Sequence, residues 1–167
     1  MTSSETATNA WQQVETEYQR RADLIPNLVS TVKGFAAQES KVFKDVTDAR
    51  SKVGQISIDI SKATPAQIAQ FQSAQDSLGS ALTRLLAVAE NYPQLKSSEN
   101  FLTLQSQIEG TENRVSVERK RYNDAIRAFN LAVKRFPSSL IAGMFGFGER
   151  EYFEAKEGTE NAPQVQF

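Results

Sequence analysis

Apolar residues recur at alternating steps of four and three along the first third of the chain. One set has members a multiple of seven residues apart: Trp11, Tyr18, Ile25, Val32, Val46, Val53 and Ile60. A second set follows the same rule: Val14, Leu28, Phe35, Val42, Ala49 and Ile56. Such a stripe covers one side of an α-helix, which must then pack that side against other helices. The pattern predicts one long first helix from Trp11 to at least Gly54.

Pro26 lies within this stripe and leaves two interpretations open. Proline cannot donate a hydrogen bond to the carbonyl of Ala22, and its ring crowds that turn. Because the heptad register passes Pro26 unbroken, we favour a single helix that is kinked there. The alternative is a true break, which would make four shorter helices. The end of this helix beyond Gly54 is also open, because residues 56–60 fit a short strand as well.

A second helix is indicated by its capping residues. Thr64, Pro65 and Gln67 form a capping-box pattern with proline at the first helical position, and Pro93 ends the segment. The stripe between them is Ile68, Phe71, Leu78, Leu82, Leu85, Ala89 and Tyr92.

A third helix begins near Ser98, a candidate N-cap, and ends at Pro137. Its members seven residues apart are Phe101, Ile108, Val115, Tyr122, Phe129 and Phe136. The predicted fold is therefore all-α: an elongated up-and-down bundle of three to four long helices, with the first kinked or broken near Pro26.

The length of 167 residues predicts one domain. We place the helical bundle at residues 1–155 and expect a polar, disordered tail at residues 156–167. The apolar stretch 140–147, with Tyr152 and Phe153 after it, either folds back as a cap on the end of the bundle, which we favour, or offers an interaction patch.

Polar side chains occupy some stripe positions, namely Arg21 and Glu39 in the first helix and Thr111 and Glu118 in the third. A buried charge is costly unless it is paired and hydrogen-bonded, so partners are expected nearby. The candidate interhelical polar network comprises Arg20, Arg21, Asp23, Asn27, Glu39, Glu112, Asn113, Arg114 and Glu118. We favour a role in helix register and topology, with a ligand site as the alternative.

The amino-acid composition limits the kinds of catalytic and metal-binding site that the chain can form. Nineteen basic and twenty acidic residues give a net charge of −1, and the chain has no Cys and no His. Thiolate nucleophiles, histidine general bases and the usual zinc sites are therefore excluded. We predict no catalytic residues, no metal site and no cofactor, although an enzyme built on Glu, Arg and Tyr stays open as a rival. The basic third helix could contact anionic lipid, but it interleaves no aromatic side chains for nucleic-acid bases, so no nucleic acid is expected.

Several motifs together resemble the LemA family. They are RRADLIPNLV (20–29), VKGFA (32–36), ENYPQLK (90–96), EGTENRV (109–115), RYN (121–123), RFPSSLIAGMFGF (135–147) and YFEA (152–155). The resemblance implies a helical bundle behind an N-terminal single-pass transmembrane helix, on the cytoplasmic side of the inner (cytoplasmic) membrane. It brings no molecular activity with it. Members of the family commonly carry His where Gln38 stands, so any role of that imidazole is lost here.

The resemblance sets the remaining expectations. The anchor would be about 20 apolar residues shortly before Thr2. We expect a membrane-tethered interaction or scaffold module that contacts an unidentified protein partner and is a monomer or a weak oligomer. The alternative function is an anionic lipid-surface binder that uses the basic face of the third helix.

Overall fold

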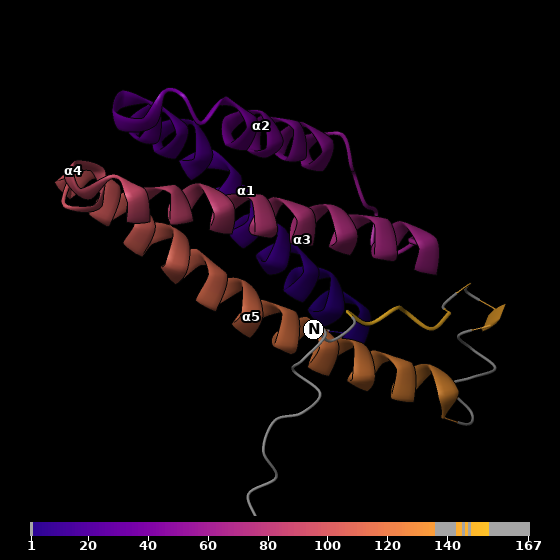
Figure 1. Ribbon diagram of the computed structural model, residues 1–167. Helices are drawn as coiled ribbons and strands as arrows, with labels where there is room; N and C mark the ends of the chain where they lie inside the picture. The colour runs from indigo at the N-terminus through magenta and orange to yellow at the C-terminus, as the bar shows by residue number, and fades with distance from the viewer. Residues whose placement is uncertain (1, 136–142, 145, 147, 154–167) are drawn as a thin grey trace, which may run out of the picture.

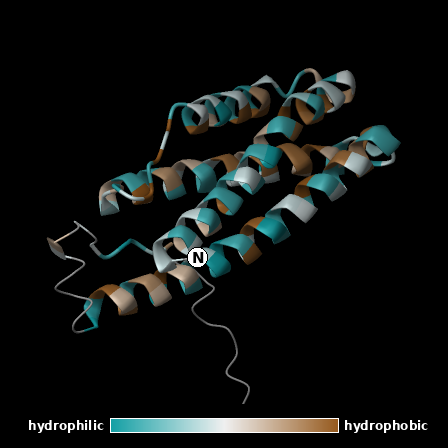
Figure 2. Cartoon of the chain, turned by 180° about the vertical axis from the view of Figure 1, so that it is seen from behind, coloured by the Kyte–Doolittle hydropathy of each residue, from teal (hydrophilic) through white to brown (hydrophobic). Residues whose placement is uncertain are grey.

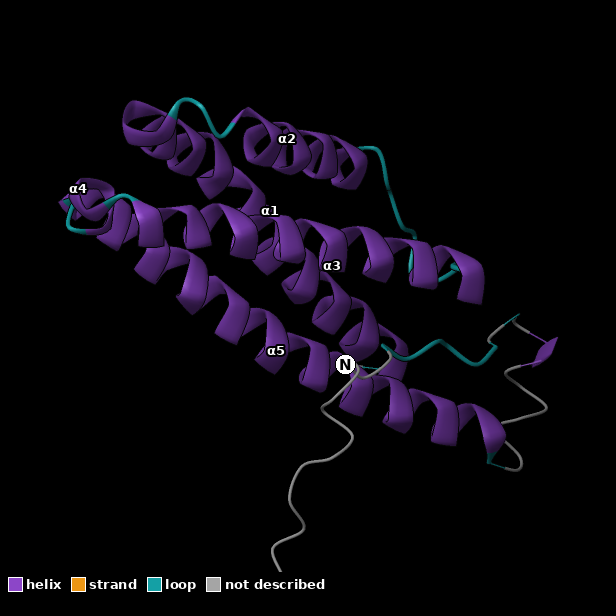
Figure 3. Ribbon diagram, viewed as in Figure 1, coloured by secondary structure: helices purple, strands orange, loops and turns teal. Residues whose placement is uncertain are grey.

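Every described residue lies in a helix, a turn or a segment without regular secondary structure. The computed structural model describes residues 2–135, 143, 144, 146 and 148–153. Its elements are α1 (Ser3–Ala36), α2 (Ser40–Gly54), α3 (Pro65–Ala87), the 3₁₀ helix η1 (Val88–Asn91), α4 (Pro93–Lys96) and α5 (Glu99–Lys134) (Figure 1). No strand occurs among these residues (Figure 3). The predicted all-α class is confirmed, and residues 56–60 form no strand.

The four longer helices alternate in direction. α1 packs along α5, and α2 packs along α3 (Figure 1). With 34 and 36 residues, α1 and α5 are each about 50 Å long at 1.5 Å per residue. Among the described residues, no helix combines the length and the apolar character needed to cross a membrane. The proposed tail at residues 156–167 lies outside the described residues.

Pro26 lies inside α1 and does not interrupt it, so the alternative of a break there is wrong. Proline removes the donor that would bond to the carbonyl of Ala22, and Arg50 of α2 supplies one instead, with its Nε 3.1 Å from that oxygen. The proline ring is exposed and displaces no core side chain. Because Arg50 bonds to the freed carbonyl, Pro26 destabilises the helix less than a proline that leaves a carbonyl without a partner.

The first helix instead ends at Ala36, and α2 begins at Ser40, so the predicted single helix to Gly54 is wrong. The heptad spacing runs across this turn, and Glu39, the N-cap of α2, makes no side-chain capping bond. The chain reverses here because α2 then packs Phe43 and Val46 into the core. Near the turn, Phe35 is 41% exposed although the stripe predicts it buried.

Most stripe residues do form the core, in two clusters along the bundle. Figure 2 shows hydrophobic and hydrophilic residues alternating along each helix. One cluster, toward the turn between α1 and α2, includes Ile25, Leu28, Val32, Val46, Leu78, Leu82, Leu85, Phe101 and Ile108. The other, which we call the Trp11 end, includes Trp11, Val14, Tyr18, Ile68, Phe71, Val115, Tyr122, Phe129 and Phe153.

Residues 148–153 pack against the Trp11 end. Phe153 is 5% exposed and joins that core cluster. For this segment the structure agrees with folding back onto the bundle. Most of the apolar stretch 140–147 lies outside the described residues.

Candidate functional site

Arg21 lies at the centre of a buried polar cluster that joins three helices. It is 2% exposed. Its Nη1 donates to Glu112 Oε1 on α5 at 2.8 Å, and its Nη2 donates to the backbone oxygen and to Oε1 of Gln75 on α3, each at 2.7 Å. Gly79 makes room for this approach, because a Cβ there would lie 3.3 Å from Arg21 Nη1. One guanidinium therefore fixes the relative positions of α1, α3 and α5.

A second polar cluster lies one turn away around Glu17, which is 6% exposed. Glu17 accepts hydrogen bonds from Arg20 Nη1 at 3.1 Å and from Arg114 Nε at 3.0 Å. Arg114 also donates from Nη2 to Thr111 Oγ1 at 3.3 Å. This carboxylate therefore links α1 to α5 next to the Arg21 cluster.

The structure brings Arg20, Arg21, Glu112 and Arg114 into these two clusters, but the other predicted members lie apart. Two of them bond within their own helices: Asp23 with Gln19, and Glu118 with Arg121. Glu39 instead lies near the turn between α1 and α2, where it accepts a hydrogen bond from Tyr92 at 3.2 Å. Asn27 and Asn113 are exposed. The described contacts therefore join four of the nine predicted residues in these two clusters.

Two central members of these clusters, Glu17 and Gln75, are not among the residues that the sequence predicts. Gln75 stands four residues after Phe71 and three before Leu78, so it occupies a stripe position that could have been recognised. Glu17 carries no such signal, because it precedes the stripe residue Tyr18 by one. Its burial depends on how α1 is rotated against α5.

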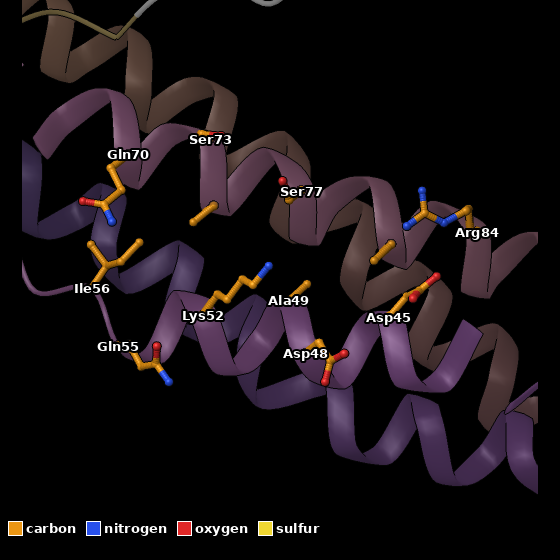
Figure 4. A pocket seen from close by; sticks show the side chains of 12 residues that line it. Asp45, Asp48, Ala49, Lys52, Gln55, Ile56, Gln70, Ser73, Ser77 and Arg84 are labelled. Atoms are coloured by element: carbon orange, nitrogen blue, oxygen red, sulfur yellow. The ribbon is translucent and has the colours of Figure 1, made fainter. Parts of the chain in front are cut away.

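A groove of about 740 Å³ lies between α2 and α3 (Figure 4). Small side chains such as Ala49, Ser73 and Ser77 line it, and Lys52 extends into the space between the two helices. Its two carboxylates are already paired: Asp45 lies 3.1 Å from Lys41, and Asp48 lies 2.6 Å from Lys44. The groove is therefore open, mixed in charge and lined by two helices.

A second groove, at the Trp11 end, is filled by the chain's own segment 148–153. The Phe153 ring stacks on Trp11 with 5.5 Å between centroids and meets Tyr122 edge-on at 5.4 Å. Arg119 Cζ lies 4.7 Å from the centre of the same ring, a cation–π contact. The Phe71 ring of α3 lies 6.5 Å away between centroids, so α1, α3 and α5 together form an aromatic pocket for this phenylalanine.

Side chains of α5 also bind the backbone of the segment. Asn130 accepts from the Arg150 N–H at 2.9 Å and donates to the Arg150 carbonyl at 3.1 Å. Asn123 accepts from the Phe153 N–H at 3.0 Å and donates to its carbonyl at 3.4 Å. The Tyr122 hydroxyl donates to the Glu151 carbonyl at 3.0 Å. Burial raises the pKa of Tyr122 well above its usual value, so the hydroxyl stays a donor to a higher pH than an exposed tyrosine would.

Arg150 fastens the other end of the segment to α1. Its guanidinium donates to Ser4 Oγ at 2.9 Å and to Thr8 Oγ1 at 3.2 Å, and its Cζ lies 4.6 Å from the centre of the Phe129 ring. Burial lowers the pKa of Arg150 from its usual value. The side chains of Arg150 and Phe153, together with hydrogen bonds to the backbone of Arg150, Glu151 and Phe153, therefore hold the segment on the bundle.

The basic face of α5 is largely engaged with carboxylates. The seven cations concerned are Arg114, Arg119, Lys120, Arg121, Arg127, Lys134 and Arg135. Of these, four lie within 4.0 Å of an acidic oxygen: Arg114, Arg119, Arg121 and Lys134. Paired cations attract anionic lipid less than free ones, which weakens the case for a lipid-binding stripe.

Antiparallel helices joined by a buried arginine, with residues 148–153 packed against them, define a helical-bundle protein. The model of the LemA family matches residues 10–167. The chain therefore belongs to the LemA family.

Curated relatives agree with this assignment. The chain is 28% identical over 163 residues to magnetosome protein MamQ 2 of Paramagnetospirillum magneticum, covering 85% of this chain and 58% of that protein. It is 27% identical over 175 residues to MamQ of Magnetospirillum gryphiswaldense, covering 90% and 63%. It is 25% identical over 149 residues to LemA of Metamycoplasma hominis, covering 89% and 64%. The chain thus spans about three fifths of the length of these relatives.

Proposed function

We propose that this chain is the helical-bundle interaction module of a membrane-tethered LemA-family protein and is not an enzyme. The observation that carries the proposal is the open groove between α2 and α3. Its partner would be another protein, which binds there as a helix or an extended segment.

The dimensions of the groove support a polypeptide partner. Its lining runs from Asp45 to Lys52 on α2, with Gln55 and Ile56 just beyond the end of that helix, and from Gln70 to Arg84 on α3. At 1.5 Å per residue the helical spans are about 10 Å and 21 Å, or two to four helical turns. Small side chains along the groove permit close approach of a partner backbone, and charges of both signs suit the polar rim of a protein interface.

The chemistry of the described residues gives less support to catalysis. A catalytic acid or base is expected in a cavity with a shifted pKa. Among the described residues, Tyr122 has the largest upward shift in pKa. Its side chain is packed beneath residues 148–153 and binds their backbone. The groove carboxylates Asp45 and Asp48 are tied to lysines on their own helix.

Family membership supports membrane association, and we propose a single N-terminal anchor with the bundle on the cytoplasmic side of the cytoplasmic membrane. The test is fractionation of the protein made from its natural gene, followed by protease protection of inverted vesicles. Recovery in the membrane fraction, with the bundle cleaved in inverted vesicles, is expected. Recovery wholly outside the membrane fraction would refute the anchor.

Site-specific photo-crosslinking tests the interaction module itself. A photoreactive residue at Ser77 lines the groove, while one at the exposed Ser51 of α2 lies outside its lining and serves as the control. In cells, a discrete adduct is expected at Ser77 and not at Ser51, and Ser73→Arg should abolish it by filling the groove. Equal labelling at both positions would contradict the proposal. Flotation with anionic vesicles that disappears at high salt would instead favour a lipid-surface binder.

A further inference from the structure

Residues 148–153 contact the bundle as a bound peptide would, through backbone hydrogen bonds and through individual side chains. Asn123 and Asn130 each bind both backbone groups of one residue, Phe153 and Arg150 respectively. The two asparagines are seven residues apart on α5, which is about 10.5 Å along a helix. The two residues they bind are three apart, about 10 Å along an extended chain. The helix therefore presents a pair of amide clamps at the repeat distance of an extended peptide.

Two side chains give this recognition its sequence specificity. Phe153 fills the aromatic pocket beside Trp11, and Arg150 reaches Ser4 and Thr8. Of the two residues between them, Glu151 is bound through its carbonyl, and Tyr152, which is 40% exposed, accepts a hydrogen bond on its hydroxyl from Asn130 Nδ2 at 3.3 Å. The two side chains that hold the segment at its ends are thus an arginine and, three residues later, a phenylalanine. Within this chain the pattern Arg-x-x-Phe occurs once, at residues 150–153.

We propose that this groove is a binding site for extended Arg-x-x-Phe segments, and that a second copy of the same chain supplies the segment when copies are concentrated together. The inference deepens the proposed interaction function and rests on it, but it concerns a different surface from the α2–α3 groove. None of the contacts depends on how the segment is joined to α5. The segment of another copy can therefore make the same hydrogen bonds and ring contacts.

Tethering decides which copy occupies the groove in dilute solution. A tethered segment has an effective concentration on the order of millimolar, so at micromolar protein each copy fills its own groove. Copies crowded on one surface approach that concentration, and exchange then links them. The bundle is accordingly a monomer or weak oligomer when dilute and self-associates when concentrated.

The first test releases the segment in the full chain with the double variant Arg150→Ala/Phe153→Ala. A fluorescent peptide Gly-Glu-Arg-Glu-Tyr-Phe, copied from residues 148–153, should bind this variant saturably and bind the wild-type chain at least roughly tenfold more weakly, because the tethered segment competes. A peptide with alanine in place of its Arg and Phe is the matched control and should not bind. Adding Asn123→Ala/Asn130→Ala to the released chain should abolish binding. Failure of the peptide to bind a released chain that keeps its circular dichroism would overturn the proposal.

A second measurement keeps Arg150, Phe153 and the side chains that bind them. Lys134 Nζ and Glu149 Oε1 lie 2.7 Å apart on the exposed side of the contact, and the chain has no cysteine. A concentrated mixture of Lys134→Cys chains and Glu149→Cys chains is treated with a short bismaleimide. A product of twice the chain mass should form, and excess peptide or Phe153→Ala on the Glu149→Cys chain should suppress it. No product above the level of the unmixed chains would refute exchange between copies, while a Ser77 adduct would still support the proposed interaction function.

Discussion

Replacing Arg21 with alanine tests whether the buried cluster holds the bundle together. Arg21 is 2% exposed and donates to Glu112 on α5 and to two oxygens of Gln75 on α3. The Arg21→Ala variant removes the guanidinium donor from these oxygens and empties the space of the side chain. We expect a large loss in the free energy of unfolding and no change in helical topology.

The size of this loss in the free energy of unfolding depends on which hydrogen-bond partners of Arg21 stay buried. The Glu112 side chain is 38% exposed, so water can solvate its carboxylate once the arginine is gone. Gln75 is 3% exposed, and its abandoned Oε1 costs about 1–3 kcal/mol, whereas its backbone oxygen lies within α3 and keeps its helical hydrogen bond. With the lost packing added, Arg21→Ala should destabilise by about 3–5 kcal/mol, as expected for breaking a buried charge pair.

Urea unfolding followed by circular dichroism measures the difference. Arg20→Ala is the matched control: its side chain is 59% exposed and pairs with Glu17, so removing it should cost only about 0.2–1 kcal/mol. Arg21→Lys keeps the charge but cannot reach all three acceptors, so it should fall between the two. A loss below about 1 kcal/mol for Arg21→Ala, equal to that of a surface pair, would refute the reasoning.

Three further predictions concern the segment, a cap and pH. Phe153→Ala should cost roughly 3 kcal/mol, because a ring that is 5% exposed leaves its stack on Trp11, and a red shift of Trp11 fluorescence should report the opened pocket. Thr64→Ala should cost about 1 kcal/mol in thermal or urea unfolding, because the Thr64 side chain caps α3, whereas Thr64→Ser should be nearly neutral. Burial raises the pKa of Tyr122 above its ordinary 10.0, so its contribution to stability is full below pH 10 and declines as the pH rises further. Tyr122→Phe should therefore lower stability modestly at neutral pH and make its alkaline decline less steep in urea titrations; an unchanged alkaline slope would contradict this.

The heptad pattern by itself determined the helical class and most of the core. A stripe on a helix must be buried, so spacing alone identifies residues such as Trp11, Leu78 and Tyr122 as interior. Capping chemistry is equally local: the bonds between Thr64 and Gln67 form within one turn, and the start of α3 was predicted from them. The motifs also indicated the LemA family, which the family model confirms.

Only the tertiary structure decided where the first helix ends and which polar residues meet. Helix spacing continues across the turn at Ala37, and the chain reverses there because α2 packs on α3, a contact between segments far apart in sequence. Gln75 and Glu112 become partners of Arg21 because three helices adopt one particular rotation and offset. Likewise, the site for Phe153 exists only once α1, α3 and α5 are assembled around it. Local spacing determines which side of a helix is buried, whereas the partner of each buried group depends on contacts between helices that spacing within one helix does not contain.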